Sequence, residues 1–448
     1  MTQQMSNSTH ARETLVLGVP LIGSSLAQMA LHVTDTVMVG WYGVVPLAAV
    51  VLGASSFFII FVVGSGFAKA VMPMVAAALG REDETQVRRD TRMGIWLSIA
   101  YGILTLPIFW WSGPILLALG QDPEVSAIAQ DYMRIVGFGL APALVVTVLQ
   151  SYLSALHRTQ VVLWVTLAAV GLNIAVNWAL IFGNWGFPEM GARGAAVATI
   201  STQVLSLIGL GLYAGLLPEL KRFHLFQRFW RPDWQAMRQV WRLGLPIGLT
   251  GLAEGGLFQA SALMMGWIGT VELAAHGIAL EVAALTFMMH VGISSAATIR
   301  VARFDGQGDR VALRQAAKVA VVISLGIAVA SVVLFLSIPE PIVALFLDLE
   351  KPESAAILAY GTMLLGLAAL FQLADGIQVM ALGLLRGVQD TRVPMWLAAV
   401  SYWLIGIPCS YLLAFPLGFG GAGLWLGLVV GLICAAGSLM WRFWRLAR

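Results

Sequence analysis

LGVPLIGSSLAQMALHVTDTVMVGWYGVVPLAA, residues 17–49, is an apolar stretch that occurs twice in this chain. The second copy is LGLPIGLTGLAEGGLFQASALMMGWIGTVELAA, residues 243–275. Aligned without a gap, the copies agree at 14 of 33 positions, which include a proline, a Gly-Trp pair and a further glycine. Unrelated apolar helices share mostly Leu, Ala and Val, so these matches indicate an internal duplication. The polar residues do not repeat: Asp35 aligns with Ser261, and Glu254 aligns with Gln28.

The composition is that of an integral membrane protein. Of the 448 residues, 59% are hydrophobic and 11% are charged, against about 25% charged residues in soluble domains. The chain contains twelve apolar runs of roughly 20 residues, each long enough to cross the hydrocarbon core as a helix. They centre near residues 27, 58, 101, 143, 172, 204, 254, 285, 328, 370, 405 and 429. We therefore predict an all-α membrane protein with twelve transmembrane helices in two six-helix lobes.

The duplication also predicts the domain boundaries. We expect an N-terminal lobe at residues 1–216 and a C-terminal lobe at residues 242–448. Residues 217–241, rich in Arg, Trp and Phe, are interpreted as a cytoplasmic linker, and an amphipathic segment on the inner membrane surface is the alternative. Repeated six-helix lobes are typical of secondary transporters, whose sites lie near the middle of the membrane.

The distribution of basic residues predicts the orientation. If the chain starts inside, 23 of its 26 Lys and Arg residues lie in cytoplasmic segments, and only Arg134, Arg193 and Lys351 lie outside. Because basic loops stay in the cytoplasm, both termini should face it. The polar opening runs straight into a full-length span, so we expect no cleavable signal peptide. The net charge of +3 then reflects topology and indicates no nucleic-acid partner.

Signatures of nucleotide and metal chemistry are missing from the sequence. It contains no GxxxxGK[ST] motif, so bound ATP is not the expected energy source, and Gly64-Ser-Gly66 is interpreted as close helix packing. The two cysteines, Cys409 and Cys434, lie inside predicted spans without further ligands. The spans contain neither a His/Glu metal cluster nor a Ser/His pairing. We predict that the chain is not an enzyme and needs no cofactor.

Acidic residues inside spans are functional candidates, because an acid at the bilayer centre costs about 2.5–3.5 kcal/mol on insertion scales. Three stand out: Asp35, Glu254 and Asp375. Glu254 lies 12 residues from Arg242 and Asp375 lies 11 residues from Arg386, so both carboxyl groups should lie about 17–18 Å from a basic helix end. Two carboxylates at one depth are not easily ionised together, which makes this pair a candidate carrier of H⁺ or Na⁺. A structural hydrogen bond to a neighbouring helix is the alternative for each.

Uncharged polar groups accompany Asp35. In GLNIAVNWALIFG, Asn173 and Asn177 are four residues apart and share one helix face. Thr199 takes a similar position on the next span. With Asp35, their oxygen atoms could complete a cage for a hard cation. Polar contacts between helices are the alternative explanation for the two asparagines.

The whole set of features resembles the multidrug and toxic compound extrusion (MATE) family, in its bacterial NorM-like branch. The resemblance rests on the LGxP openings of spans one and seven, TDTVMVG at residues 34–40, Glu254, Asp375 and RGVQDT at residues 386–391. It covers essentially the whole chain. It implies a monomeric antiporter of the bacterial inner membrane that exports amphipathic organic cations from a V-shaped cavity between its lobes, in exchange for Na⁺ or H⁺.

The resemblance also implies which residues couple transport to the ion. The residues carried over are an N-lobe site of Asp35, Asn173, Asn177 and Thr199, a C-lobe site of Glu254 and Asp375, and a helix-bending proline, Pro20. A rigid start of the helix is the alternative role for Pro20. Many members have Asp where this chain has Asn177, a departure that weakens the case for Na⁺ in the N lobe. A lipid-linked oligosaccharide or lipid flippase of the wider superfamily is the alternative function. Such proteins usually have two further spans and basic groups in the cavity, and this chain has neither.

Overall fold

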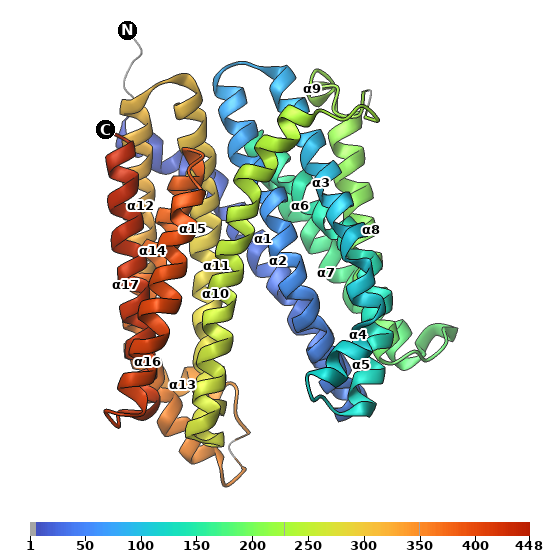
Figure 1. Ribbon diagram of the computed structural model, residues 1–448, viewed down its shortest axis with the longest axis vertical. Coiled ribbons are helices and arrows are strands. Elements are labelled where there is room, and N and C mark those ends of the chain that lie inside the picture. The colour runs from blue at the N-terminus through green and yellow to red at the C-terminus, as the bar shows by residue number, and fades with distance from the viewer. Residues whose placement is uncertain (1–5, 228, 349) are drawn as a thin grey trace. The chain divides into compact units, whose positions relative to one another are not determined.

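The computed structural model describes residues 6–227, 229–348 and 350–448, and every regular element in these residues is a helix (Figure 1). Eleven helical segments of the described chain are long and apolar enough to cross a membrane. The helix α10 (Trp234–Ile268) has 35 residues but a more polar, glycine-containing sequence. These eleven segments and α10 each contain one of the twelve predicted span centres. The predicted fold class is confirmed.

The helices divide into two compact units. The N-terminal unit, Gly23–Leu249, contains parts of α1 (Asn7–Tyr42) and α10. Its other helices are α2 (Val44–Gly80), α3 (Glu84–Trp110), α4 (Ser112–Ala118), α5 (Pro123–Val136), η1 (Gly137–Gly139), α6 (Leu140–Ala155), α7 (Thr159–Phe182), η2 (Asn184–Gly186), α8 (Ala192–Leu216) and α9 (Pro218–Lys221).

The C-terminal unit consists of Met1–Ile22 and Thr250–Arg448. Besides the remaining parts of α1 and α10 it contains α11 (Thr270–Gln307), α12 (Arg310–Ser337), α13 (Pro339–Ala344), α14 (Ser354–Gly387), α15 (Arg392–Ala399), the π-helix η3 (Val400–Gly406), α16 (Ile407–Ala414) and α17 (Gly420–Leu446). Each unit thus takes part of the first helix of the other repeat. The lobe and linker ranges expected from the sequence follow the repeat, and they stay a prediction.

In the N-terminal unit, α2 packs against α3, α5 and α6, and α7 packs against α8. Glycines allow the closest approaches. A Cβ on Gly66 of α2 would lie 2.2 Å from the carbonyl oxygen of Gly244 in α10. Close packing by small residues is therefore the role of the Gly64-Ser-Gly66 segment, as the sequence predicted.

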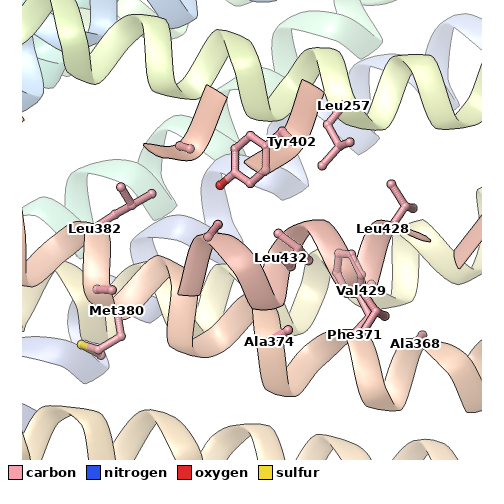
Figure 2. Packing of buried hydrophobic residues seen from close by; sticks show 14 of the residues in the cluster. Leu257, Ala368, Phe371, Ala374, Met380, Leu382, Tyr402, Leu428, Val429 and Leu432 are labelled. Carbon is pink, nitrogen blue, oxygen red and sulfur yellow. The ribbon is translucent and has the colours of Figure 1, made fainter. Parts of the chain in front are cut away.

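The core of the C-terminal unit lies among α11, α14 and α17, with α16 and η3 packed on α17. Figure 2 shows part of this core, in which Phe371 and Ala374 of α14 lie near Leu428 and Val429 of α17. Tyr402 of η3 is fully buried in the same cluster. A π-helix rotates the residues that follow it relative to a regular helix and often occurs at functional sites.

A buried arginine ties the start of α1 to the C-terminal unit. Arg300 of α11 is 3% exposed. Its guanidinium donates to Thr14 Oγ1 at 2.8 Å and to the backbone carbonyl of His10, and it pairs with Glu13 at 3.0 Å. These contacts explain why the first turns of α1 belong with the second repeat rather than with the first.

The segment after α9 lies against α3. Arg92 donates to the backbone carbonyls of Gln227 and Arg231, at 3.1 and 3.0 Å, and Trp96 Nε1 donates to the carbonyl of Phe229 at 2.9 Å. Arg89 pairs with Asp233, which immediately precedes α10, at 2.5 Å. This hydrogen-bonded guanidinium lowers the pKa of the Asp233 carboxyl below its ordinary value. The region expected as a linker is therefore held by side chains of α3, and its last residues form the first turns of α10.

Candidate functional site

In the described residues, each unit contains a cluster of polar side chains built around intramembrane acids. In the N-terminal unit the cluster surrounds Asp35 of α1, and we call it the Asp35 site. In the C-terminal unit it surrounds Glu254 of α10 and Asp375 of α14, and we call it the acid-pair site. The two sites lie on helices of the two repeats but are built from different side chains.

The Asp35 site consists of one carboxylate and three hydrogen-bond donors. Asn173 and Asn177 of α7 donate from their Nδ2 atoms to Asp35 Oδ1, at 3.0 and 2.6 Å. Thr199 of α8 donates from Oγ1 to Asp35 Oδ2 at 3.1 Å. The structure thus brings together all four residues that the sequence assigned to the N lobe.

Helix periodicity and close packing create this arrangement. Asn173 and Asn177 face the same way because they are one turn apart, and Asn177 Nδ2 also donates to Asn173 Oδ1 at 3.1 Å. Helix α8 approaches α7 closely at Gly194, where a Cβ would lie 2.7 Å from the backbone carbonyl carbon of Leu180. This approach places Thr199, little more than one turn further along α8, beside the carboxylate.

The chemistry of the Asp35 site suits a single positive charge. Both asparagines are fully buried, and each turns its amide nitrogen toward Asp35. The Oδ1 atom of Asn177 accepts no hydrogen bond from the described residues. An asparagine side chain carries both an NH₂ donor group and an acceptor oxygen, and rotation of the amide decides which of them faces a neighbouring group. The same residues can therefore stabilise an ionised carboxylate or, with the amides turned over, surround a cation with oxygen atoms.

The acid-pair site contains two acids on different helices. Asp375 is 1% exposed and Glu254 is half-buried. The two carboxyl groups lie close enough to interact electrostatically. Asp375 Oδ1 accepts no hydrogen bond from the part of the chain that the structure describes. Two carboxyl groups that interact in a poorly solvated place favour binding of a proton or cation between them.

Three further residues join the acid pair, and sequence analysis did not assign them to the site. Gln378 of α14 donates from Nε2 to the hydroxyl oxygen of Tyr402 at 2.5 Å, and both residues are fully buried. Tyr402 interacts electrostatically with both acids and with Arg386. Arg386 interacts with Glu254 as well. The spacing of Asp375 and Gln378, three residues apart on one helix face, was the only signal in the sequence.

Pro20 lies inside α1, two residues before the point where the chain passes from one unit to the other. The proline lacks a backbone donor and so removes one hydrogen bond of the helix. On either side of it α1 packs tightly against α11: a Cβ on Gly18 would lie 2.6 Å from Ile293, and one on Gly292 would lie 2.5 Å from Ile22. Pro246 has the equivalent position in α10, three residues before the second division at Leu249.

Among the described residues, no group of three or more His, Cys, Asp or Glu side chains is placed to hold a metal ion. The spans do contain two hydrogen-bonded Ser/His pairs, Ser261 with His276 at 3.3 Å and Ser324 with His290 at 2.9 Å. The expectation that no such pairing occurs within the spans was therefore wrong.

Comparison with known proteins agrees with this geometry. The model of the MatE family matches the chain twice, at residues 20–179 and 246–412. The chain belongs to the MatE family. The two matched regions begin at Pro20 and Pro246, the two aligned prolines of the internal duplication, so the family unit and the sequence repeat coincide. The chain is a multi-pass membrane protein of this family.

Close relatives extend over nearly the full length. The chain is 48% identical to a probable multidrug resistance protein NorM of Rhizobium meliloti, over 99% of this chain and 96% of the relative. It is also 48% identical to a protein of the same name from Agrobacterium fabrum, over 97% and 94%. These matches confirm the predicted NorM-like branch of the family.

Solved structures of the family share the fold. A eukaryotic MATE transporter has a TM-score of 0.86 with 22% sequence identity, covering 99% of both chains. An outward-facing multidrug resistance MATE family transporter has a TM-score of 0.88 with 19% identity, covering 98% of this chain and 96% of the other.

Proposed function

We propose that this protein is a secondary antiporter that exports organic cations and other amphipathic drugs across a bacterial inner membrane in exchange for Na⁺ or H⁺. The observation that carries the proposal is the acid within the membrane in each family unit: Asp35 in the first, and the pair Glu254 and Asp375 in the second. Intramembrane acids are retained at a cost and mark ion and substrate pathways.

The relatives support drugs as the substrate class. They are named multidrug resistance proteins, and the solved neighbours are titled transporters rather than enzymes. We therefore assign no enzymatic activity and no cofactor. A flippase function has no support in the names of these relatives.

We propose separate roles for the polar residues. Asp35, Asn173, Asn177 and Thr199 bind the coupling ion or a cationic substrate in the N-terminal unit, and Glu254 with Asp375 binds the coupling ion in the C-terminal unit. Pro20 acts as the bending point of α1. Both termini lie in the cytoplasm, the protein works as a monomer in the bilayer, and it has no nucleic-acid partner.

A membrane gradient supplies enough energy for this exchange. One elementary charge that crosses the membrane gains roughly 2.3 kcal/mol per 100 mV. Since about 1.4 kcal/mol corresponds to a factor of ten, the entry of one ion drives accumulation by several tens of fold without nucleotide hydrolysis. Displacement of a bound cation by the entering ion then gives exchange, because each ligand lowers the affinity for the other.

The test is dye transport by purified protein in liposomes. A fluorescent organic cation is followed under an imposed pH gradient without Na⁺, and separately under a Na⁺ gradient at equal pH. We expect the dye to move against the direction of the ion under at least one gradient. The double variant Glu254→Gln with Asp375→Asn, at equal protein content, serves as the control. If liposomes with the wild-type protein moved no more dye than empty liposomes under both gradients, the proposed function would be contradicted.

A further inference from the structure

An apolar groove of about 450 Å³ runs between α14 and α17 in the C-terminal unit and is open to the surface. Its floor is made of small residues, Ala374, Ala436 and Gly437, while Leu370 and Ile433 stand at its sides. These two larger residues are 45% and 53% exposed. The groove therefore results from a row of small side chains between larger ones on neighbouring helices.

A tryptophan and a free cation lie at one end of the groove. Trp441 lines the groove and is 64% exposed. The guanidinium of Arg445, one turn further along α17, lies over the Trp441 ring at 5.4 Å from its centroid. Arg445 is exposed and has no acidic partner among the described residues, whereas the neighbouring Arg442 pairs with Asp390 at 2.5 Å. The positive charge of Arg445 is thus available to a ligand.

We propose that this groove is a binding site for an anionic phospholipid, with one acyl chain in the groove and the phosphate of the headgroup on Arg445. An unfilled groove in hydrocarbon loses the dispersion contacts of its walls, so a flexible chain that follows the floor is retained. Tryptophan prefers the level of the headgroups. Basic residues between transmembrane helices at the cytoplasmic side bind anionic headgroups.

The chemistry of the groove favours a lipid over a transported drug. Its lining contains no acidic residue, and the charged group at its end is a guanidinium. An organic cation would be repelled by Arg445, while a phosphate diester is attracted and accepts its hydrogen bonds. The site is separate from the acid pair, although Ala374 of its floor directly precedes Asp375 in α14.

Two variants separate the acyl chain from the headgroup. A Cβ on Gly437 would meet nothing within 4 Å, so Gly437→Leu fits and fills the groove. Arg445→Gln removes the charge and leaves the groove open. The matched controls are Gly326→Leu on α12, where a Cβ also meets nothing within 4 Å, and Arg238→Gln, an exposed arginine of the N-terminal unit.

The measurement is lipid retention by native mass spectrometry of the purified full chain in detergent, with equal amounts of added phosphatidylglycerol and phosphatidylcholine. We expect wild type and both controls to retain phosphatidylglycerol about fivefold better, which corresponds to the roughly 1 kcal/mol expected for one basic residue near an anionic surface. Arg445→Gln should lose this preference, and Gly437→Leu should retain less of both lipids. Unchanged melting temperatures establish that the variants are folded.

Three results would overturn the proposal: equal retention of the two lipids by wild type, an unchanged preference in Arg445→Gln, or unchanged retention in Gly437→Leu. Displacement of bound phosphatidylglycerol by an organic cation would instead assign the groove to the substrate. Lipid retention does not depend on an ion gradient, so the result stands whether or not the protein proves to be an antiporter.

Discussion

The Asp35 site and the acid-pair site occupy the two halves of a duplicated scaffold, yet they hold their acids in different ways. Asp35 is a single carboxyl group that accepts hydrogen bonds from two amides and one hydroxyl. Asp375 interacts with a second acid, Glu254, and one of its oxygen atoms lacks a donor among the described residues. The duplication therefore preserved the helices but not the chemistry of the sites.

This difference predicts a division of labour. Three neutral donors offset part of the cost of burying a charged Asp35, so this single carboxyl group can exchange a proton for a cation. Two interacting acids are not stable when both are ionised in a poorly solvated place, and Arg386 offsets only one of the two negative charges, so the acid pair needs a further proton or cation. We expect the acid pair to determine coupling to the ion and the Asp35 site to determine competition between the ion and the cationic substrate.

The largest expected effect is the loss of ion-driven efflux when either acid of the pair is neutralised. Glu254→Gln and Asp375→Asn each leave one carboxyl group, which no longer has a partner that enforces ion binding. Dye efflux from liposomes under an imposed gradient should fall to the level of protein-free liposomes, with expression unchanged.

Glu272→Gln is the matched control for the acid pair, because Glu272 lies in the first turn of α11 and is not part of the pair. It should transport as wild type does. If either variant of the pair keeps wild-type efflux under the gradient, that acid has a structural role only, and the proposed division between the two sites fails.

A smaller effect is expected for Asp35→Asn. The variant removes the only acid of the site and leaves three donors facing a neutral amide, so binding of a cationic substrate should weaken about tenfold or more. The part of the pH dependence that comes from Asp35 should disappear, because the variant has no acid at this position. Substrate affinity between pH 6 and 9 in purified wild type and variant measures both effects.

Thr199→Ala is the companion variant to Asp35→Asn: it removes one of three donors and keeps the acid, so the pH dependence should persist with a weaker affinity. An unchanged pH profile in Asp35→Asn would remove Asp35 from the mechanism. The acid pair would then be the sole coupling site, and the two halves would no longer divide the function between them.

The third prediction concerns the support of the acid pair. Tyr402→Phe leaves the buried amide of Gln378 without its acceptor, which costs about 1–3 kcal/mol. We expect a lower melting temperature and slower efflux. Adding Gln378→Leu removes the unpaired amide and should restore most of the stability, because loss of both partners of a buried hydrogen bond is far less costly than loss of one.

Efflux by this double variant decides what the hydrogen bond does. If efflux stays low while stability is restored, the pair positions the hydroxyl of Tyr402 for the acids. If efflux recovers together with stability, Tyr402 and Gln378 serve packing only, and the acid pair acts without them.

The sequence predicted the spans and the Asp35 cluster because both depend on local periodicity. The apolar runs give the helices, and the four-residue spacing of Asn173 and Asn177 places them on one face. Tyr402 was not assigned to the site, because it lies in a π-helix whose register differs from the regular helix that the sequence suggests. Only the folded chain shows that its hydroxyl meets Gln378.

The sequence also gave no indication that α3 holds the segment before α10. Arg92 and Trp96 donate to backbone carbonyls, and any residue supplies a carbonyl, so no pattern of side chains reveals the contact. In the same way, the first turns of α1 belong to the C-terminal unit because Arg300 hydrogen-bonds to the His10 carbonyl and to Thr14. No local sequence pattern specifies these contacts.

The smallest effect is expected for Asp233→Asn. This residue belongs to neither the Asp35 site nor the acid-pair site, so the variant tests whether these two sites alone account for transport. Arg89 and Asp233 are 32% and 25% exposed, and a pair at that level stabilises by about 1 kcal/mol or less, so the melting temperature should fall by no more than about 2 °C. Because the pKa of Asp233 is lowered in the folded state, the pair is fully formed above the unfolded value of about 3.9 and is lost only as the pH falls through the folded value. The difference from wild type should therefore stay constant between pH 8 and 5, and gradient-driven efflux should be unchanged. A loss of efflux as large as that of Glu254→Gln, at equal protein content, would show that coupling depends on the attachment of this segment to α3 as well as on the two acid sites.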